Sequence, residues 1–313
     1  MLILERIILD VDTGIDDALA ISYAVGSSEL DVLGITTCFG NVSVESATEN
    51  TLKVLEQLGV DIPVASGAHQ PIFHPMIKDY STHFHGENGL ANLDLPMSNK
   101  KPLSIHATEF IIEQIKRYPH EVTLICVGSL TNLALIIMQE PEIVSLIKKV
   151  VIMGGAVTVP GNNQMHAEAN IYADPEAADL VFKSGAPITL VGLDVTTKTR
   201  LTLDDVKKWR EGETKLSDFL AGITEFYIDK YNKLHGDLDY CYLHDPLAVA
   251  VAIDSSLVEI KSMYIQVDLE GHYSYGRTIP DLRERSNKLP NVDVCIDVDE
   301  KRFLEHFLQS IAI

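Results

Sequence analysis

The N-terminal segment DVDTGIDDA, residues 10–18, carries four aspartates within eight residues. The four are Asp10, Asp12, Asp16 and Asp17, and the segment contains no lysine or arginine that could balance them. Carboxylates this close repel one another unless a cation holds them, and Ca²⁺ and Mg²⁺ prefer such oxygen ligands. A role for Asp16 and Asp17 in starting a helix would explain only part of the cluster. The segment therefore predicts a site for a hard divalent cation.

A second acidic segment, LHDPLAVA, occupies residues 243–250. His244 and Asp245 stand directly before Pro246, a residue that suits the first turn of a helix. Asp245 could cap that helix, or it could be a further ligand of the cation. The sequence alone leaves both interpretations open.

The overall charge limits the partners. The chain has 313 residues, and with 25 Lys+Arg against 45 Asp+Glu its formal net charge is −20. Such a surface repels the phosphates of nucleic acids and anionic membranes, so we expect neither as a partner. The four cysteines form no CxxC pair, which favours buried thiols over a disulfide framework or a zinc site. The N-terminus does not show a signal-peptide pattern, and we expect a cytoplasmic protein.

Short apolar runs alternate with amphipathic stretches along the chain. This alternation predicts an open, mostly parallel sheet covered by helices on both faces, with extra helices in the C-terminal half, as a single domain over 1–313. The strands expected are residues 6–11, 32–38, 122–127, 150–153, 188–193, 263–267 and 292–298. The helices expected are residues 15–25, 44–58, 105–117, 130–138, 175–183, 203–210, 215–233, 246–253 and 300–311.

Loops of small and polar residues follow these expected strands. In open α/β sheets, sites form where parallel strands end at their carboxyl edge. The loops concerned are DVDTG, CFGN, VGSLTN, MGGA and LDVT. Asp10 and Asp12 lie two residues apart, so they should point the same way. Glu168 and Asn170 should likewise share one face of an extended segment.

Six motifs in order resemble those of one family, over nearly the full length. The motifs are DVDTGIDDALA, GSLTNLA, MGGA, HAEANIYADPEAA, HDPLAVA and PNVDVCIDVD. The chain resembles the nucleoside hydrolases, the inosine-uridine preferring group of nucleoside N-ribohydrolases. The resemblance implies an enzyme with a Ca²⁺ ion at the base of an open α/β fold.

The resemblance also implies roles for individual residues. Asp12, Asp17 and Asp245 resemble the carboxylate ligands of the metal, and the carbonyl of Val127 stands where a further oxygen is supplied. Asp16 resembles the acid that holds the ribose 2′-hydroxyl, and Asp10 a residue that supports the loop. Positions that hold the sugar are matched by Asn41, Met153, Asn162, Glu168 and Asn170.

The reaction implied is hydrolysis of the N-glycosidic bond of a ribonucleoside to ribose and free base. The metal would lower the pKa of a water molecule, and Asp12 would take its proton as general base. His244 matches the family's general acid for purine leaving groups, although it could equally well only shape the pocket. His85 resembles a histidine near the base, and Tyr227 and Tyr231, four residues apart, could flank it or simply pack.

Base preference and competing functions remain open at this stage. The only tryptophan, Trp209, is expected on a polar helix, so a purine-stacking tryptophan is not expected, which favours a pyrimidine-preferring or broad-specificity enzyme. A haloacid-dehalogenase-like phosphatase also begins with a strand and two aspartates, but that motif wants Thr or Val where this chain has Gly14. A third reading is a non-catalytic nucleoside- or sugar-binding protein. The family resemblance further implies a homodimer or homotetramer.

Overall fold

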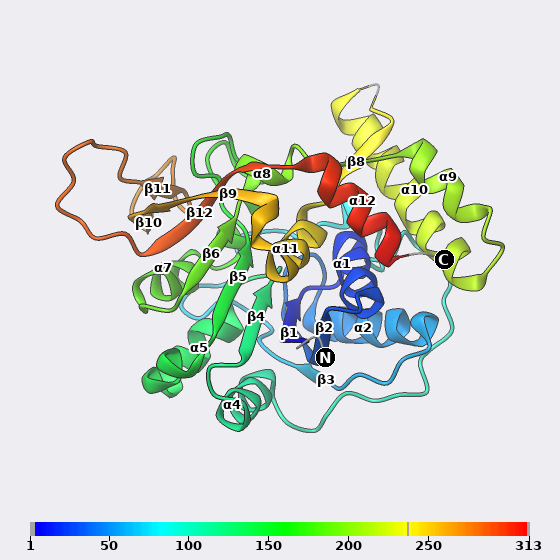
Figure 1. The fold of residues 1–313 in the computed structure, drawn as a ribbon, viewed down its shortest axis with the longest axis horizontal. Coiled ribbons are helices and arrows are strands. Elements are labelled where there is room, and N and C mark those ends of the chain that lie inside the picture. The colour runs from blue at the N-terminus through cyan, green and yellow to red at the C-terminus, as the bar shows by residue number, and fades with distance from the viewer. Residues whose placement is uncertain (1–3, 237, 312–313) are drawn as a thin grey trace.

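The centre of the molecule is an eight-stranded sheet in the order β3-β2-β1-β4-β5-β6-β12-β9 (Figure 1). The computed structural model describes residues 4–236 and 238–311. The strands of the central sheet are β1 (Glu5–Val11), β2 (Leu30–Thr37), β3 (Val64–Ser66), β4 (Val122–Cys126), β5 (Lys149–Met153), β6 (Ile188–Val191), β9 (Val258–Met263) and β12 (Val292–Val298). Two further pairs of strands are β7 (Arg200–Thr202) with β8 (Tyr240–Tyr242), and β10 (Ile265–Val267) with β11 (Thr278–Pro280).

The strand order reverses between β1 and β4, and this point locates the site. Neighbouring strands of the central sheet are parallel, except for the edge strand β9, which runs antiparallel to β12. In the register, Asp10 of β1 lies opposite Thr36 of β2 and Cys126 of β4. Loops that leave two parallel strands toward opposite sides open a crevice between them. The aspartate loop after β1 and Val127 after β4 therefore meet at this crevice.

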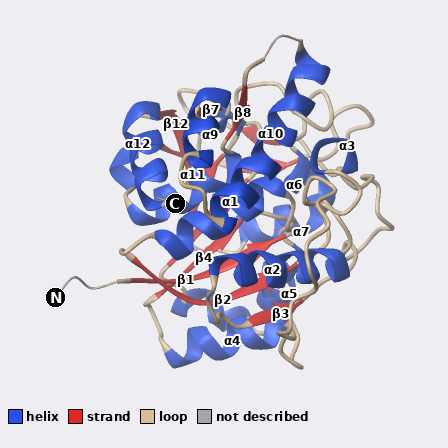
Figure 2. Ribbon diagram, turned by 90° about the vertical axis from the view of Figure 1, so that its right-hand side faces the viewer, coloured by secondary structure: helices blue, strands red, loops and turns tan. Residues whose placement is uncertain are grey.

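Helices cover the sheet on both faces (Figure 2). The helices are α1 (Ile15–Gly26), α2 (Val44–Leu58), α3 (Thr82–His85), α4 (Ala107–Arg117), α5 (Thr131–Gln139), α6 (Ala169–Ala173), α7 (Pro175–Lys183), α8 (Leu193–Thr196), α9 (Leu203–Arg210), α10 (Lys215–His235), α11 (His244–Ile253) and α12 (Glu300–Ser310). Short 3₁₀ helices span η1 (Pro141–Leu146) and η2 (Ser255–Leu257).

Strand β1 shows how the two layers are built. Ile7 and Leu9 belong to the core shared with α1, α2, α10, α11 and α12, whereas Ile8 belongs to the core shared with α4, α5 and α7. This alternation is the period of two expected for a strand that is buried on both faces. The fully buried β1 therefore holds the aspartate loop that follows it on a rigid support.

The predicted fold class is confirmed, with local differences. The expected strand over 263–267 is divided between β9 and β10, because the chain leaves the central sheet after Met263. LDVT was expected as a loop after β6 and instead forms the short helix α8. The expectation of an extended segment around Glu168 was wrong, since α6 starts at Ala169 and Glu168 is its N-cap. The short strands β3, β7, β8 and β11 carried too little periodicity to be predicted.

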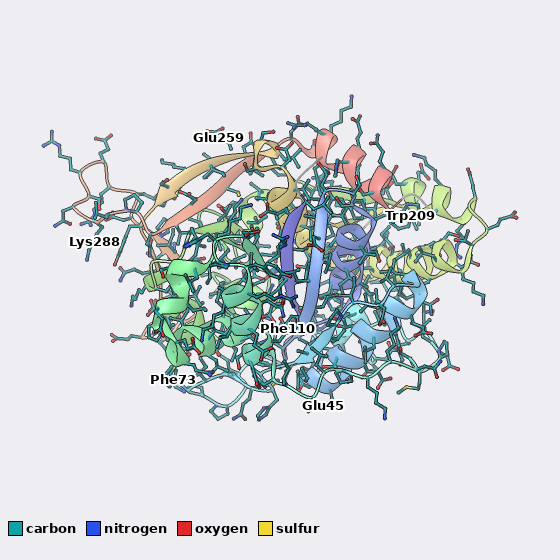
Figure 3. The ribbon with its side chains drawn as sticks, turned by 60° about the horizontal axis from the view of Figure 1, so that its bottom comes forward. Glu45, Phe73, Phe110, Trp209, Glu259 and Lys288 are labelled. Atoms are coloured by element: carbon teal, nitrogen blue, oxygen red, sulfur yellow. The ribbon has the colours of Figure 1, made fainter. Side chains whose placement is uncertain are left out.

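The four cysteines are free and buried, as the apolar runs around Cys38, Cys126 and Cys295 predicted for those three. Trp209 is buried on α9 and packs against Phe307 of α12, away from the aspartate loop (Figure 3). Over the described parts of the chain, no helix combines the length and the apolar character needed to cross a membrane.

Candidate active site

The aspartate loop is closed by the first turn of α1. The two carboxylate oxygens of Asp17 accept hydrogen bonds from the backbone N–H groups of Asp12 (3.0 Å) and Gly14 (2.9 Å). An acid in the third helical position is well placed for such bonds, because the first N–H groups of a helix have no partner within it. Asp17 thus fixes the conformation of the loop that presents Asp12.

Asn41, in the loop after β2, holds Asp12 from the other side. Its backbone N–H donates to Asp12 Oδ2 (2.6 Å), and its Nδ2 donates to Asp12 Oδ1 and to Asp17 Oδ2 (3.1 Å each). Burial raises the pKa of Asp12 well above its usual range, and the neighbouring charge of Asp17 raises it further. Asp12 is therefore oriented by donors yet retains a strong affinity for a proton.

Asp16 and Asp245 bring α1 and α11 together. The backbone N–H of Asp245 donates to Asp16 Oδ2 (2.9 Å), while Asp16 Oδ1 is buried without a hydrogen-bond partner among the described residues. Burial is the largest cause that raises the pKa of Asp245 well above normal, and the charges of Asp16, Asp17 and Asp12 raise it further. A buried oxygen without a donor costs free energy, so Asp16 Oδ1 is poised to accept a hydrogen bond from a ligand.

Asp10 supports this arrangement from behind. Its Oδ1 accepts from Thr36 Oγ1 (2.6 Å) and Asn132 Nδ2 (2.8 Å). Burial raises its pKa to about 6 despite these bonds. Asp10 and Asp12 were expected to point the same way, but their partners differ: Asp10 binds β2 and α5, whereas Asp12 binds Asn41.

Asn170 and Glu168 join the ends of β4 and β5. Asn170 Nδ2 donates to the carbonyl oxygens of Val127 (2.7 Å) and Met153 (3.2 Å). Glu168 accepts from three backbone N–H groups, those of Gly155 and Asn170 (2.9 Å each) and Ile171 (3.1 Å). A carbonyl oxygen has two lone pairs, so Val127 keeps one for a further ligand.

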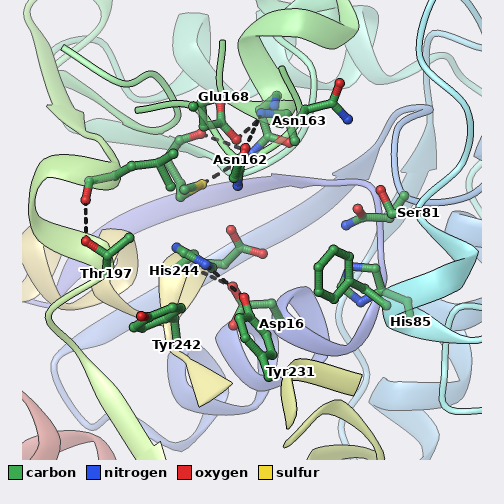
Figure 4. A pocket seen from close by; sticks show the side chains of 18 of the residues that line it. Asp16, Ser81, His85, Asn162, Asn163, Glu168, Thr197, Tyr231, Tyr242 and His244 are labelled. Carbon is green, nitrogen blue, oxygen red and sulfur yellow. Dashed lines mark hydrogen bonds between the residues drawn. The ribbon is translucent and has the colours of Figure 1, made fainter. Parts of the chain in front are cut away.

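These residues surround a cavity of about 470 Å³ at the carboxyl edge of the sheet (Figure 4). Its lining includes the predicted residues Asp16, Asn41, His85, Val127, Met153, Asn162, Glu168, Asn170, Tyr227, Tyr231, His244 and Asp245. The remaining predicted residues, Asp12 and Asp17, are fully buried and joined to the lining through Asn41. Asn162 Oδ1 accepts from the N–H of Ala169 (3.0 Å), which ties its loop to α6.

One wall of the cavity is aromatic. His85 stacks on Tyr227, with the ring centroids 5.3 Å apart, and Tyr231 packs edge-on against Tyr227 at 5.0 Å. His85 Nδ1 accepts from the backbone N–H of Ile15 (3.0 Å), so its proton is on Nε2. Burial lowers the pKa of His85 to about 3, which keeps the ring neutral near pH 7. His85 can therefore offer an N–H group next to a flat aromatic surface.

His244 is hydrogen-bonded at both ring nitrogens. Tyr231 Oη lies 3.2 Å from Nε2 and Thr196 Oγ1 lies 2.7 Å from Nδ1 (Figure 4 shows Tyr231 and His244). Burial lowers the pKa of His244 to about 4, so the neutral ring dominates near pH 7. The Tyr231–His244 contact shows that the tyrosine does more than pack.

Replacement of Thr196 by Val should slow reactions that depend on His244. Valine keeps the shape of Thr196 but leaves Nδ1 without its hydrogen-bond partner, so the orientation of the His244 ring is less well held. The loss of one such hydrogen bond should lower kcat on inosine by about tenfold. The measurement is steady-state release of ribose from inosine.

Nitrophenyl riboside supplies the control, because its leaving group departs without an acid. Thr196→Val should leave this substrate within about twofold of wild type, and Thr196→Ser should restore activity on inosine. An equal loss on both substrates would show that Thr196 acts on the fold and not through His244.

Several cavity residues were not found from the sequence. They are Ser81, Phe84, Val159, Asn163, Leu193, Thr197, His235 and Tyr242. His83 is exposed and lies at the rim of the cavity. A strand-end loop signals where a site is, but the far wall comes from α3 and α10, whose contribution depends on tertiary packing.

The donor set fits a calcium ion chemically. Asp12, Asp17, Asp245 and the carbonyl of Val127 are hard oxygen ligands, and like-charge repulsion among the carboxylates favours a cation between them. Within residues 4–236 and 238–311, no three acidic, histidine or cysteine side chains are already arranged to hold a metal ion. The carboxylates of Asp12 and Asp17 are instead hydrogen-bonded to amide groups.

Comparisons with known proteins decide the family. The family model described as inosine-uridine preferring nucleoside hydrolase matches residues 7–305. The chain belongs to the inosine-uridine preferring nucleoside hydrolase family. It is a nucleoside hydrolase, and the phosphatase interpretation is not retained.

Relatives of this nucleoside hydrolase carry different substrate names. Uridine nucleosidase 1 of Arabidopsis thaliana is 41% identical over 88% of this chain and 82% of its own length. The pyrimidine-specific ribonucleoside hydrolase RihA of Salmonella arizonae is 36% identical over 96% of both chains. Among solved structures, a purine-preferring ribonucleoside hydrolase from Gardnerella vaginalis superimposes with a TM-score of 0.94 at 42% identity, over 98% of both chains.

Proposed function

We propose that this nucleoside hydrolase cleaves the N-glycosidic bond of both purine and pyrimidine ribonucleosides in a calcium-dependent reaction. The observation that carries the proposal is the convergence of buried carboxylates with one aromatic-walled cavity at the β1–β4 crevice. The cavity volume of about 470 Å³ lies in the usual range for small-molecule sites.

The carboxylates have separate roles toward the sugar and the attacking water. Calcium held by Asp12, Asp17, Asp245 and the Val127 carbonyl would supply ligand sites for vicinal hydroxyls and would lower the pKa of water. Asp16 Oδ1, buried and without a partner among the described residues, is available to a ribose hydroxyl. Asp12, which Asn41 orients through both of its carboxylate oxygens, is placed to accept a proton from water as general base.

The base is bound and released on the opposite wall. The rings of Phe84, Tyr227 and Tyr231 offer flat apolar surface to a purine or a pyrimidine. His85 offers its Nε2–H to the base, and His244 with Tyr231 provides a hydrogen-bonded route for a proton to the leaving nitrogen. This His–Tyr pair favours broad specificity over pyrimidine specificity, because purine leaving groups gain most from protonation.

The test is ribose release from uridine and from inosine in phosphate-free buffer, with and without a calcium chelator. We expect turnover of both substrates, within about tenfold of each other in kcat/KM, and loss of both on chelation with recovery on added Ca²⁺. Activity that survives complete chelation would overturn the calcium dependence. Turnover of uridine alone would overturn broad specificity, and binding without turnover would support the non-catalytic reading.

The oligomeric state and the location in the cell are two further predictions. A homodimer or homotetramer would be detected by light scattering of the purified protein, and a cytoplasmic location by fractionation of the source cells.

A further inference from the structure

Asn132, in the first turn of α5, is fully buried, and its side-chain amide contacts three separate parts of the chain. Its Nδ2 group donates to Asp10 Oδ1 (2.8 Å) and to the carbonyl oxygen of Thr37 (3.0 Å), and its Oδ1 atom accepts from the N–H of Ala68 (2.9 Å). Because two of these partners are acceptors and the third is a donor, only one orientation of the amide satisfies all three. The side chain therefore joins β1, β2 and the segment over residues 67–81.

Two of the three contacts lie at the start of the loops that hold the proposed general base. Asp10 is near the end of β1 and precedes Asp12 by two positions. Thr37 ends β2, and the loop that follows it carries Asn41, which donates to both carboxylate oxygens of Asp12 (2.6 and 3.1 Å). One buried amide is thus bonded to the chain just before each of the two groups that must meet.

The position of Asp10 depends strongly on Asn132. Asp10 Oδ1 accepts from Thr36 Oγ1 as well as from Asn132, whereas Asp10 Oδ2 is buried without a hydrogen-bond partner among the described residues. Two donors to one oxygen therefore hold the whole carboxylate. Removal of the amide donor would leave Thr36 alone to hold the end of β1 in place.

The third contact fastens the segment over residues 67–81, which forms neither a helix nor a strand. The carbonyl of Ala68 accepts from the N–H of Phe39 (3.0 Å), and the N–H of Ser81 donates to the carbonyl of Asn41 (2.9 Å). Both ends of the segment are thus tied to the loop that carries Asn41. By holding Ala68, the amide supports this loop from a second side.

We propose that Asn132 is a positioning residue that acts on hydrolysis through Asp12, by holding the aspartate loop and the Asn41 loop in a fixed relation. This inference rests on the proposed role of Asp12 as general base. None of the three hydrogen-bond partners of Asn132 lines the cavity. Loss of the amide should therefore lower kcat and leave KM nearly unchanged, since the base is displaced and the substrate contacts are not.

The first variant is Asn132→Asp, which keeps the size of the side chain and its acceptor for Ala68 but removes both donors. It also places a second carboxylate beside Asp10. We expect kcat for ribose release from inosine, in excess Ca²⁺, to fall about a hundredfold while KM stays within about threefold of wild type. Far-UV circular dichroism and Tm establish that the variant is folded.

A double-mutant cycle shows whether the effect passes through Asp12. In an Asp12→Asn background, Asn132→Asp should lower kcat by less than about threefold further, because the base that it positions is already lost. Single-turnover assays at high enzyme concentration give access to these slow rates. Losses that simply add would overturn the positioning role alone. Wild-type kcat in Asp12→Asn by itself would overturn the general base, and the positioning role with it.

Exchange of the two polar groups provides a rescue. In Asp10→Asn combined with Asn132→Asp, the amide at position 10 can donate to the carboxylate at position 132, so the hydrogen bond returns with its direction reversed. We expect kcat to recover about tenfold from the Asn132→Asp level, although the carbonyl of Thr37 still lacks its donor. A folded double variant without recovery would show that the link to Asp10 does not position the base.

Gly67→Ala disturbs the same amide without changing its chemistry. A Cβ atom on Gly67 would lie 2.3 Å from Asn132 Oδ1 and 2.6 Å from the carbonyl oxygen of Thr37, so the amide has to shift. This variant should lower kcat by about tenfold with little change in KM. Asn99→Asp, the same chemical change as Asn132→Asp at an exposed position, should keep wild-type kinetics. Folded Asn132→Asp and Gly67→Ala proteins that both keep wild-type kcat would overturn the inference.

Discussion

Asp12→Asn is expected to lower kcat on inosine and on uridine by about a thousandfold. The amide has nearly the shape of the carboxylate and can keep one of its two hydrogen bonds from Asn41 through its oxygen, but it cannot take a proton from water. Because the proposed sugar contacts of Asp16 and Asn41 are not altered, KM should change far less than kcat. Ribose release under saturating substrate and excess Ca²⁺ provides the measurement.

The control for Asp12→Asn is Asp297→Asn, which makes the same chemical change at an exposed site on β12. This control should keep wild-type activity. Calorimetry of Asp12→Asn with CaCl₂ separates loss of the metal from loss of the base. If calcium is bound and kcat stays within tenfold of wild type, the general base is another residue.

Gly40→Ala is expected to abolish detectable hydrolysis without unfolding the protein. A Cβ atom on Gly40 would lie 1.9 Å from Asp12 Oδ2 and 2.8 Å from its Cγ, so the carboxylate must move out of its position. A displacement of about 1 Å in a catalytic group can cost roughly a hundredfold in rate, and here a proposed metal ligand moves as well. Activity and calcium affinity should therefore both fall.

Gly222→Ala is the matched control. It adds the same methyl group inside α10, where the nearest atom is Leu93 Cδ1 at 3.7 Å. Because alanine favours a helix interior over glycine by about 1 kcal/mol, this variant should be active and slightly more stable. Far-UV circular dichroism and Tm distinguish a displaced carboxylate from a misfolded Gly40→Ala protein. Wild-type activity in Gly40→Ala would show that Asp12 has freedom that the structure does not indicate.

The sequence predicted the site best where an acidic motif adjoins an apolar segment with a clear strand or helix pattern. DVDTG follows an apolar run, and the structure places Asp10 and Val11 at the end of β1 and Asp12 directly after it, at the reversal in strand order. HDPLAVA was expected to start a helix, and α11 begins at His244 with Asp245 in its first turn. Both predictions succeed because strand ends and helix starts are set by local sequence.

The remaining parts of the site depend on long-range packing. Glu168 was expected in an extended segment, but its side chain caps α6 through the N–H groups of Asn170 and Ile171, and it also accepts from the N–H of Gly155, 13 positions away in the chain. Thr196 contacts His244 across 48 positions of the chain, and nothing in LDVT distinguishes that threonine from its neighbour.

Helix α11 also bears on how new substrate preferences could arise. It carries His244 and Asp245 side by side, and its first eight residues are buried. A substitution that reshapes the His244 side of the pocket therefore also disturbs the neighbouring Asp245, whose backbone N–H is hydrogen-bonded to Asp16. Helix α10 is free of this constraint, since Tyr227 and Tyr231 belong to a helix that also carries exposed residues, among them Asp218, Asp229 and Lys233. During the divergence of related enzymes, or in laboratory evolution toward another nucleobase, we therefore expect substitutions to occur mainly on α10 and rarely on α11.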